Sequence, residues 1–186
     1  VTQWIYQKYV TSFEAMQNIP KAMRAELDEK FSIDPLEIVK KETSSDGSEK
    51  YLFRLRDGHT IETVLLLMRE ETIDDEAHTI EGARYTVCVS TQVGCKVGCA
   101  FCLTAKGGFV RNLTPGEITG QVLLIKRAMN LDTKKRLNIV YMGMGEPLDN
   151  LDNVAKAIKM FAMEDGLSIS PKRQTVSTSG LSTKIE

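Results

Sequence analysis

An alternation of strand-like and helix-like segments over the second half of the chain constrains the fold most. The segments are, in chain order, strand 84–90, helix 114–129 with the capping box Thr114-Pro115-Gly116-Glu117, strand 138–142, helix 153–163 and strand 173–177. Strand–helix–strand units of this kind build parallel sheets in which the helices form the crossovers. We therefore expect an α/β fold with three neighbouring parallel strands.

Three of the four cysteines, Cys95, Cys99 and Cys102, lie in one short loop with the spacing C-x3-C-x2-C. Three thiolates can hold three corners of an iron–sulfur cube, which normally takes four cysteine ligands, and so leave one iron open. An open metal position usually serves chemistry rather than structure. This spacing is the signature of radical S-adenosylmethionine (SAM) enzymes, in which the open iron binds SAM. A structural zinc site completed by Cys88 is the alternative.

Two further polar motifs follow predicted strands, as the cysteine loop does. They are Gly143-Met144-Gly145-Glu146 and Ser177-Thr178-Ser179-Gly180. Ligands bind outside the carboxyl ends of parallel strands, so the three motifs predict one shared site. Gly145 would let a ligand approach the backbone, and Glu146 can accept hydrogen bonds from an ammonium group. Taken singly, the first motif can be a plain turn and the serines can be helix caps.

The first part of the chain predicts a small helical domain over residues 1–46. Thr11 and Glu14 have the spacing of a capping box, and a second helix is expected from Asn18. Its apolar stripe would contain Ile19, Met23, Leu27 and Phe31. Residues 47–186 would form the main domain.

Within the main domain, a β-hairpin is expected over residues 51–67, turning at Asp57-Gly58. The acidic stretch 70–81 predicts a surface loop. Phe101, between two of the loop cysteines, is expected to shield the cluster.

Charge gives a local signal only. The 24 Lys and Arg residues nearly balance 25 Asp and Glu residues, so the net charge of −1 does not point to nucleic acid. Between residues 101 and 140, however, basic residues dominate, and they could attract phosphates or simply form a solvated face. They are Lys106, Arg111, Lys126, Arg127, Lys134, Lys135 and Arg136. The sequence shows neither a secretory signal peptide nor a transmembrane run, so we expect a reducing, cytoplasmic location.

Taken together, the motifs resemble the RlmN family of radical SAM methyltransferases, which methylate C2 of an adenine in 23S ribosomal RNA and in certain tRNAs. The motifs that carry the resemblance are Cys88-Val89-Ser90-Thr91-Gln92-Val93-Gly94-Cys95, Gly98-Cys99-Ala100-Phe101-Cys102, Gly108-Phe109-Val110-Arg111-Asn112-Leu113, Met142-Gly143-Met144-Gly145-Glu146-Pro147-Leu148 and Ser177-Thr178-Ser179-Gly180. The resemblance implies about the first half of a partial (β/α) radical SAM barrel behind a helical accessory domain that engages RNA.

The resemblance also implies roles for individual residues. Cys95, Cys99 and Cys102 would ligate a [4Fe-4S] cluster; Gly145, Glu146 and Ser177 would contact SAM; Glu62 would be the general base; and Cys88 would resolve the covalent RNA adduct by forming a disulfide bond. In the family, a second catalytic cysteine near the C-terminus carries the methyl group as a methyl-cysteine intermediate. All four cysteines here lie between residues 88 and 102, so we expect a truncated chain that is inactive alone.

The family resemblance further implies a monomer that does not bind a membrane and is reduced by flavodoxin or ferredoxin. Three rival functions stay open. They are a radical SAM methyltransferase acting on adenine C8, a radical SAM activase that makes a glycyl radical, and a non-enzymatic zinc-dependent RNA-binding module.

Overall fold

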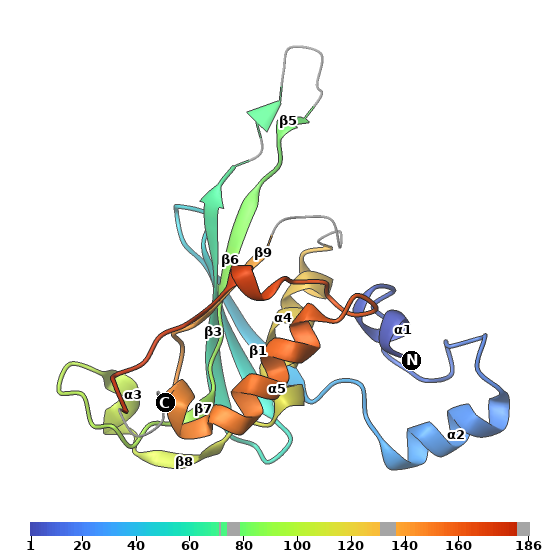
Figure 1. The fold of residues 1–186 in the computed structure, drawn as a ribbon, viewed down its shortest axis with the longest axis horizontal. Helices are drawn as coiled ribbons and strands as arrows, with labels where there is room; N and C mark the ends of the chain where they lie inside the picture. Colours follow the sequence, from blue (N-terminus) through green and yellow to red (C-terminus); the bar gives the residue numbers. More distant parts are fainter. Residues whose placement is uncertain (71, 74–78, 131–136, 182–186) are drawn as a thin grey trace.

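The computed structural model is built around one mixed six-stranded sheet with the strand order β1-β2-β3-β6-β9-β10 (Figure 1). The structure describes residues 1–70, 72–73, 79–130 and 137–181. The strands of this sheet are β1 (Leu36–Thr43), β2 (Glu49–Leu55), β3 (Thr60–Arg69), β6 (Arg84–Cys88), β9 (Leu137–Tyr141) and β10 (Gln174–Val176). Strands β1, β2, β3 and β6 pair antiparallel, whereas β6, β9 and β10 are parallel. The expected α/β class with three parallel strands is confirmed.

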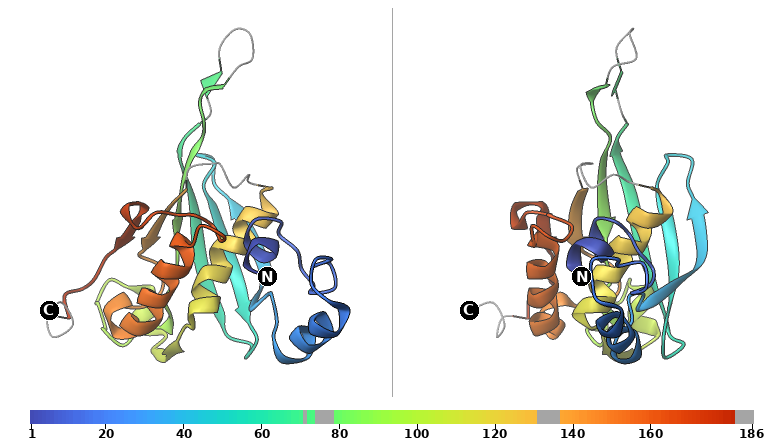
Figure 2. Two further views of the ribbon diagram at one scale, coloured as in Figure 1. Left: turned by 45° about the vertical axis from the view of Figure 1, so that its right-hand side comes forward. Right: turned by 90° about the vertical axis from the view of Figure 1, so that its right-hand side faces the viewer.

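Two helices, α4 (Pro115–Ala128) and α5 (Leu151–Ala162), cover one face of the sheet (Figures 1 and 2). The predicted capping box forms, because the Thr114 side chain accepts from the Glu117 amide while the Glu117 carboxylate accepts from the Thr114 amide. The apolar faces of both helices pack on the sheet and complete one hydrophobic core. That layer fixes the carboxyl ends of the parallel strands relative to one another.

The opposite face of the sheet carries two of the predicted functional residues. Ile61, Thr63 and Leu65 of β3 are buried on the helix side. Side chains alternate along a strand, so Glu62 points to the other face. Cys88 pairs with Val64, two residues from Glu62, and therefore lies on that same face.

The N-terminal segment contains two helices, α1 (Thr2–Tyr6) and α2 (Lys21–Lys30). The expected capping box at Thr11 is wrong, since no helix begins there, and Asn18 does not cap α2, which starts after Pro20. The chain forms bends and turns at these positions instead of the helix starts that the cap patterns predict.

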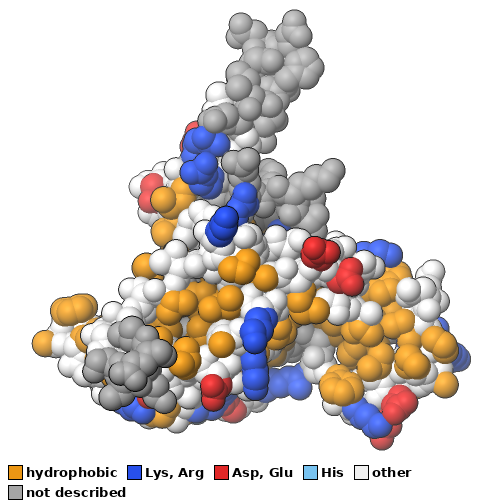
Figure 3. Space-filling model, viewed as in Figure 1, with side chains coloured by type: hydrophobic (Ala, Val, Ile, Leu, Met, Phe, Trp, Pro, Cys, Tyr) orange, Lys and Arg blue, Asp and Glu red, His pale blue; other side chains and the backbone are white. Residues whose placement is uncertain are grey.

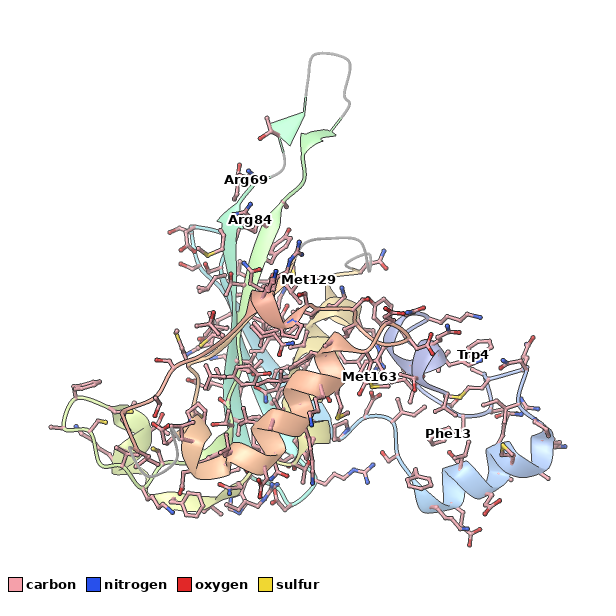
Figure 4. All side chains as sticks on the ribbon, in the orientation of Figure 1. Trp4, Phe13, Arg69, Arg84, Met129 and Met163 are labelled. Atoms are coloured by element: carbon pink, nitrogen blue, oxygen red, sulfur yellow. The ribbon has the colours of Figure 1, made fainter. Side chains whose placement is uncertain are left out.

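The expected apolar stripe of α2 is not buried. Met23 is 53% exposed and Phe31 is 62% exposed. Figure 3 shows hydrophobic side chains gathered on the surface of this part of the molecule. Trp4 and Phe13 are labelled there in Figure 4, and Phe13 is buried. Helix α1 contacts the main body through Gln7, whose amide donates to the carbonyl of Glu164 over 3.0 Å.

The predicted hairpin forms from β2 and β3, and Gly58 in its turn has φ +84°. Strand β1, which sequence reasoning missed, lies within the range 1–46 and pairs with β2. Residues 72–73 and 79–81 form the short antiparallel strands β4 (Thr72–Ile73) and β5 (Thr79–Glu81) where only a loop was expected. Residues 71 and 74–78 of that stretch lie outside the described residues.

The β4–β5 pair projects from the sheet at the end opposite the cysteine loop (Figure 1). Arg69 and Arg84 lie at the base of this projection (Figure 4). The Arg69 guanidinium donates to the carbonyl of Gly82 over 3.3 Å. Within the described ranges, no helix has both the length and the apolar character needed to cross a bilayer.

Candidate functional site

The cysteine loop is held at its base by a small two-stranded sheet. Its strands are β7 (Gln92–Gly94) and β8 (Phe109–Asn112), which pair antiparallel. Gly94 has φ +73°, and a Cβ there would lie 1.9 Å from the carbonyl oxygen of Gly108. The Cys95 amide donates to that same carbonyl over 2.9 Å. Only glycine permits this close approach, so the chain enters the loop along a fixed path.

The donor set of the loop consists of thiols. Cys95, Cys99 and Cys102 are all free and half-buried. Cys102 immediately precedes the short helix α3 (Leu103–Lys106), and hydrogen bonding from the Ala105 amide lowers the pKa of its thiol. Among the described residues, no three His, Cys, Asp or Glu side chains converge so as to hold a single metal ion. A donor set made only of thiols, one of which has a lowered pKa, fits the chemistry of an iron–sulfur cube.

The motif Gly143–Glu146 follows β9 and turns back over the start of the cysteine segment. The Gly143 amide donates to the carbonyl of Val89 over 3.0 Å. Gly145 has φ +104°, and a Cβ there would lie 2.6 Å from the Cβ of Gln92. The turn therefore needs glycine for close packing on Gln92, as well as for any ligand that approaches it.

The Glu146 carboxylate is buried and accepts four hydrogen bonds. It accepts from the Leu148 amide (3.0 Å), the Thr178 hydroxyl (2.7 Å), and the amide and hydroxyl of Ser179 (both 2.8 Å). Burial raises the pKa of Glu146, but these hydrogen bonds, led by the Ser179 amide, outweigh it and hold the pKa below its ordinary value. A carboxylate has about four acceptor positions. An ammonium group reaching Glu146 would thus replace one of these donors.

The third motif reaches the site through residues that sequence reasoning did not select. Thr178 and Ser179 donate hydrogen bonds to Glu146, and residues 177–179 are all exposed. The contact between Ser177 and SAM stays a prediction. Strand alternation could not have selected these residues, because the adjacent Thr178 and Ser179 both contact Glu146 after β10 has ended. The carboxyl ends of β6, β9 and β10 nevertheless deliver the cysteine loop and both other motifs to one end of the sheet.

Glu62 lines a cavity of about 400 Å³ beside the cysteine loop. The other lining residues are Leu52, Thr60, Ile61, Val93, Gly94, Leu103, Thr104, Gly107, Val110 and Met144. The Glu62 side chain is about half exposed and lies 3.3 Å from the ammonium of Lys50. Cys88 lies on the same face of the sheet, and burial raises the pKa of its thiol. The cavity joins the candidate base to the loop and to the Gly143–Glu146 turn.

Buried side-chain amides bond the segment before the cysteine loop to strand β3 and helix α4, and sequence reasoning missed them. The Gln121 amide accepts from the Ser90 amide over 2.8 Å and from the Thr63 hydroxyl over 2.7 Å. Ser90 in turn donates to the carbonyl of Glu62 over 2.6 Å. Asn150 donates to the carbonyls of Thr91 and Leu113. Polar residues inside an otherwise apolar helix stripe were the available signal.

Among the described residues of the basic stretch, two arginines are held in ion pairs rather than free. Arg111 forms a paired contact with Glu117 and also reaches Asp57, and Arg127 pairs with Asp34. Lys126 is buried, whereas Lys106 is exposed. Lys134, Lys135 and Arg136 lie outside the described residues. These arginines tie elements together, so a patch read from composition alone overstated the available charge.

Phe101 is 92% exposed, so its side chain is turned to solvent rather than packed over the loop. Leu103, just after the last loop cysteine, is 81% exposed. The expectation that Phe101 shields the cluster is therefore not met by its position here. The loop presents an apolar rim to solvent.

Comparisons with known proteins find relatives that are named as RNA methyltransferases. Residues 1–33 match the family model described as the ribosomal RNA large subunit methyltransferase N-terminal domain. The whole chain is 64% identical to the dual-specificity RNA methyltransferase RlmN of a Nitratiruptor species and 62% identical to that of Campylobacter concisus. It covers 52% and 49% of those two proteins. The chain thus spans about half the length of the curated relatives it matches.

A solved structure supports the same relationship at the level of fold. The crystal structure of a radical SAM methyltransferase from Sphaerobacter thermophilus superposes with a TM-score of 0.81 at 39% sequence identity. The superposition covers 97% of this chain and 49% of that one. The expected partial barrel, about half of the complete fold, is confirmed.

Proposed function

We propose that this chain, which belongs to the RlmN family, carries the cluster- and SAM-binding half of a radical SAM methyltransferase that acts on adenine C2 of 23S rRNA and tRNA. The observation that carries the proposal is the meeting of three motifs at one end of the parallel strands. Free thiols, a buried carboxylate and a small cavity there match the needs of such a site. The relatives' names extend the proposal to RNA.

In this proposal Cys95, Cys99 and Cys102 hold a [4Fe-4S] cluster, and Glu146 binds the ammonium group of SAM. Gly145 and Ser177 border the same ligand. When bound, the cluster and SAM supply one-electron chemistry that can remove a hydrogen atom from an unactivated methyl group. The lowered pKa of Glu146 keeps its carboxylate ionised, which favours a cationic partner.

Glu62 and Cys88 would serve the RNA base on the open face of the sheet. Glu62 would take the C2 proton, and its exposed carboxylate is within reach of a base entering from solvent. Cys88 would attack the sulfur of the methyl-carrying cysteine in the covalent RNA adduct, forming a disulfide bond with it. The carbon–sulfur bond to the base breaks, and the released carbon takes up a proton to give the methylated base. The raised pKa of Cys88 keeps the thiol protonated until that step. The methyl-carrying cysteine would come from outside these 186 residues.

The same reading assigns a cytoplasmic location, a monomeric state and a flavodoxin or ferredoxin as reductant. It also gives the two parts of the chain different roles. The segment that matches the N-terminal family model would engage RNA, and the sheet would hold the cofactors.

The test is anaerobic reconstitution of the chain with iron and sulfide, followed by metal analysis and electron paramagnetic resonance. We expect about four irons and four sulfides per chain, and a signal from the reduced protein that SAM perturbs. A Cys99→Ala variant should lose the cluster, whereas Cys88→Ala should keep it. One zinc per chain without sulfide would support the RNA-binding module instead. Mass mapping of RNA treated with a complete relative would separate C2 from C8 methylation.

A further inference from the structure

The cysteine loop and the Gly143–Glu146 turn share one buried amide. Gln92 is fully buried, and both ends of its side chain are bonded. Its oxygen accepts from the Glu146 amide over 2.8 Å. Its nitrogen donates to Asn112 over 2.8 Å and to the Asp149 carboxylate over 3.0 Å.

Asp149 extends this contact into the cysteine loop. Its second carboxylate oxygen lies 2.8 Å from the ammonium of Lys96, the residue directly after Cys95. The Asp149 side chain is 17% exposed, while Lys96 is 59% exposed. One carboxylate therefore joins a buried amide to an exposed cation between two candidate cluster ligands. We call Gln92, Lys96, Asn112, Glu146 and Asp149 the Gln92 network.

We propose that Gln92 is a positioning residue that, through Asp149 and Lys96, fixes the cysteine loop against the turn that carries Glu146. In the proposed site, one SAM molecule must contact the cluster on the loop and, through its ammonium group, the Glu146 carboxylate at the same time. Displacements of about 1 Å are enough to impair such alignment. The inference deepens the proposed function, because it rests on Glu146 as the ammonium ligand.

Three features of the network favour alignment over simple packing. Gln92 is held to the turn by the hydrogen bond from the Glu146 amide to its side-chain oxygen, and Gly145 packs directly on the same side chain. An apolar residue of similar size would fill the same space but could not accept from the Glu146 amide. Lys96 adds little to folding stability, since exposed ion pairs contribute weakly. Its pairing with Asp149 nonetheless selects one position of the loop.

The first test needs no cofactor. Amide hydrogen exchange is followed residue by residue in the reduced, metal-free chain for Lys96→Met and Gln92→Met. Gln92→Met should speed exchange of the Glu146 amide about tenfold or more, because that amide loses its acceptor. Lys96→Met should speed exchange of the Cys95 amide and also, about three- to tenfold, of the distant Glu146 amide.

The control is Lys30→Met, which removes a similarly exposed lysine from its pair with Glu26 (2.6 Å) on helix α2. It should leave both amides unchanged. Lys96 is exposed, so its variant should fold even if Gln92→Met does not. Faster exchange at Cys95 with an unchanged Glu146 amide in Lys96→Met would overturn the inference, because the loop would then be held independently of the turn.

The second test uses the reconstituted chain. Lys96→Met should keep its iron and sulfide content and its melting temperature, yet bind SAM about three- to tenfold more weakly than the unaltered chain. Equal SAM affinity in the two proteins would refute the positioning role while leaving the proposed function intact. If the unaltered chain binds no SAM, the proposed function fails, and the exchange experiment still decides the inference.

Discussion

Replacing Gly145 with alanine tests the close packing at the centre of the site. A Cβ at this position would lie 2.6 Å from the Gln92 Cβ, 2.8 Å from its Cγ and 2.8 Å from its backbone nitrogen. Real Cβ atoms do not approach so closely, and one of these neighbours is backbone, so the turn itself must shift. Gly145 also has φ +104°, which alanine rarely adopts.

The two costs can be separated with Gly58→Ala. Gly58 has φ +84°, but a Cβ there would meet nothing within 4 Å. We expect Gly58→Ala to cost about 1–2 kcal/mol of unfolding free energy from backbone strain alone. Gly145→Ala adds overpacking worth about 1–3 kcal/mol, for a total of about 2–5 kcal/mol.

For a chain of this length, each kcal/mol lowers the melting temperature by about 2–4 °C. Gly145→Ala should therefore melt about 4–20 °C lower, and Gly58→Ala about 2–8 °C lower. Both variants are compared by thermal and urea unfolding of the reduced, metal-free chain. Equal destabilisation by the two variants would refute the reasoning, because the contact with Gln92 would then cost nothing.

Three further tests follow from polar contacts within the fold. Thr114→Ala removes the helix cap of α4 and should cost about 1 kcal/mol in urea unfolding. Gln121→Leu leaves the Ser90 amide and the Thr63 hydroxyl unpaired and should cost about 2–5 kcal/mol, whereas Thr63→Val should cost less because Gln121 keeps its bonds to Ser90. The lowered pKa of Glu146 contributes stability above its unfolded value, near 4.5, and that stability disappears as the pH falls through the folded value. Acid unfolding of Glu146→Gln should show a shallower pH dependence than the unaltered chain; an identical profile would contradict this account.

Local patterns predicted one helix start of the parallel half and the turn of the antiparallel hairpin correctly. The cap at Thr114 and the turn at Asp57-Gly58 each combine a short-range signal with the periodicity of the segments they join. Strand β1 was not predicted because most of its residues are exposed and its sequence shows no clear apolar alternation. Its hydrogen-bonded pairing with β2 stabilises it as a strand. The prediction of a helix cap at Thr11 was wrong because the segment after it has no apolar helix face that packs against the core.

The positions of the motifs in the sequence predicted which segments form the candidate site, but not which residues within them make the contacts. The family resemblance implies that Ser177 contacts SAM, which stays a prediction, whereas the contacts of Thr178 and Ser179 with Glu146 were not predicted. Which of three adjacent polar residues faces a carboxylate depends on the backbone direction after β10, and that is fixed by tertiary contacts. Gln92 and Gln121 were missed because a buried amide resembles any polar residue until its partners are known.

The geometry of the site is set by these amides rather than by the thiols. Ser90 joins β6 to the turn, since its hydroxyl accepts from the Met144 amide over 2.8 Å. Gln92 repeats the connection two residues later, and Asn150 bonds the carbonyls on either side of the loop. Each of these contacts crosses between the ends of neighbouring strands, so the relative position of cysteine loop and carboxylate is settled during folding. A cluster that binds later would enter a frame already aligned, and loss of one amide should misplace the ligands without removing any of them.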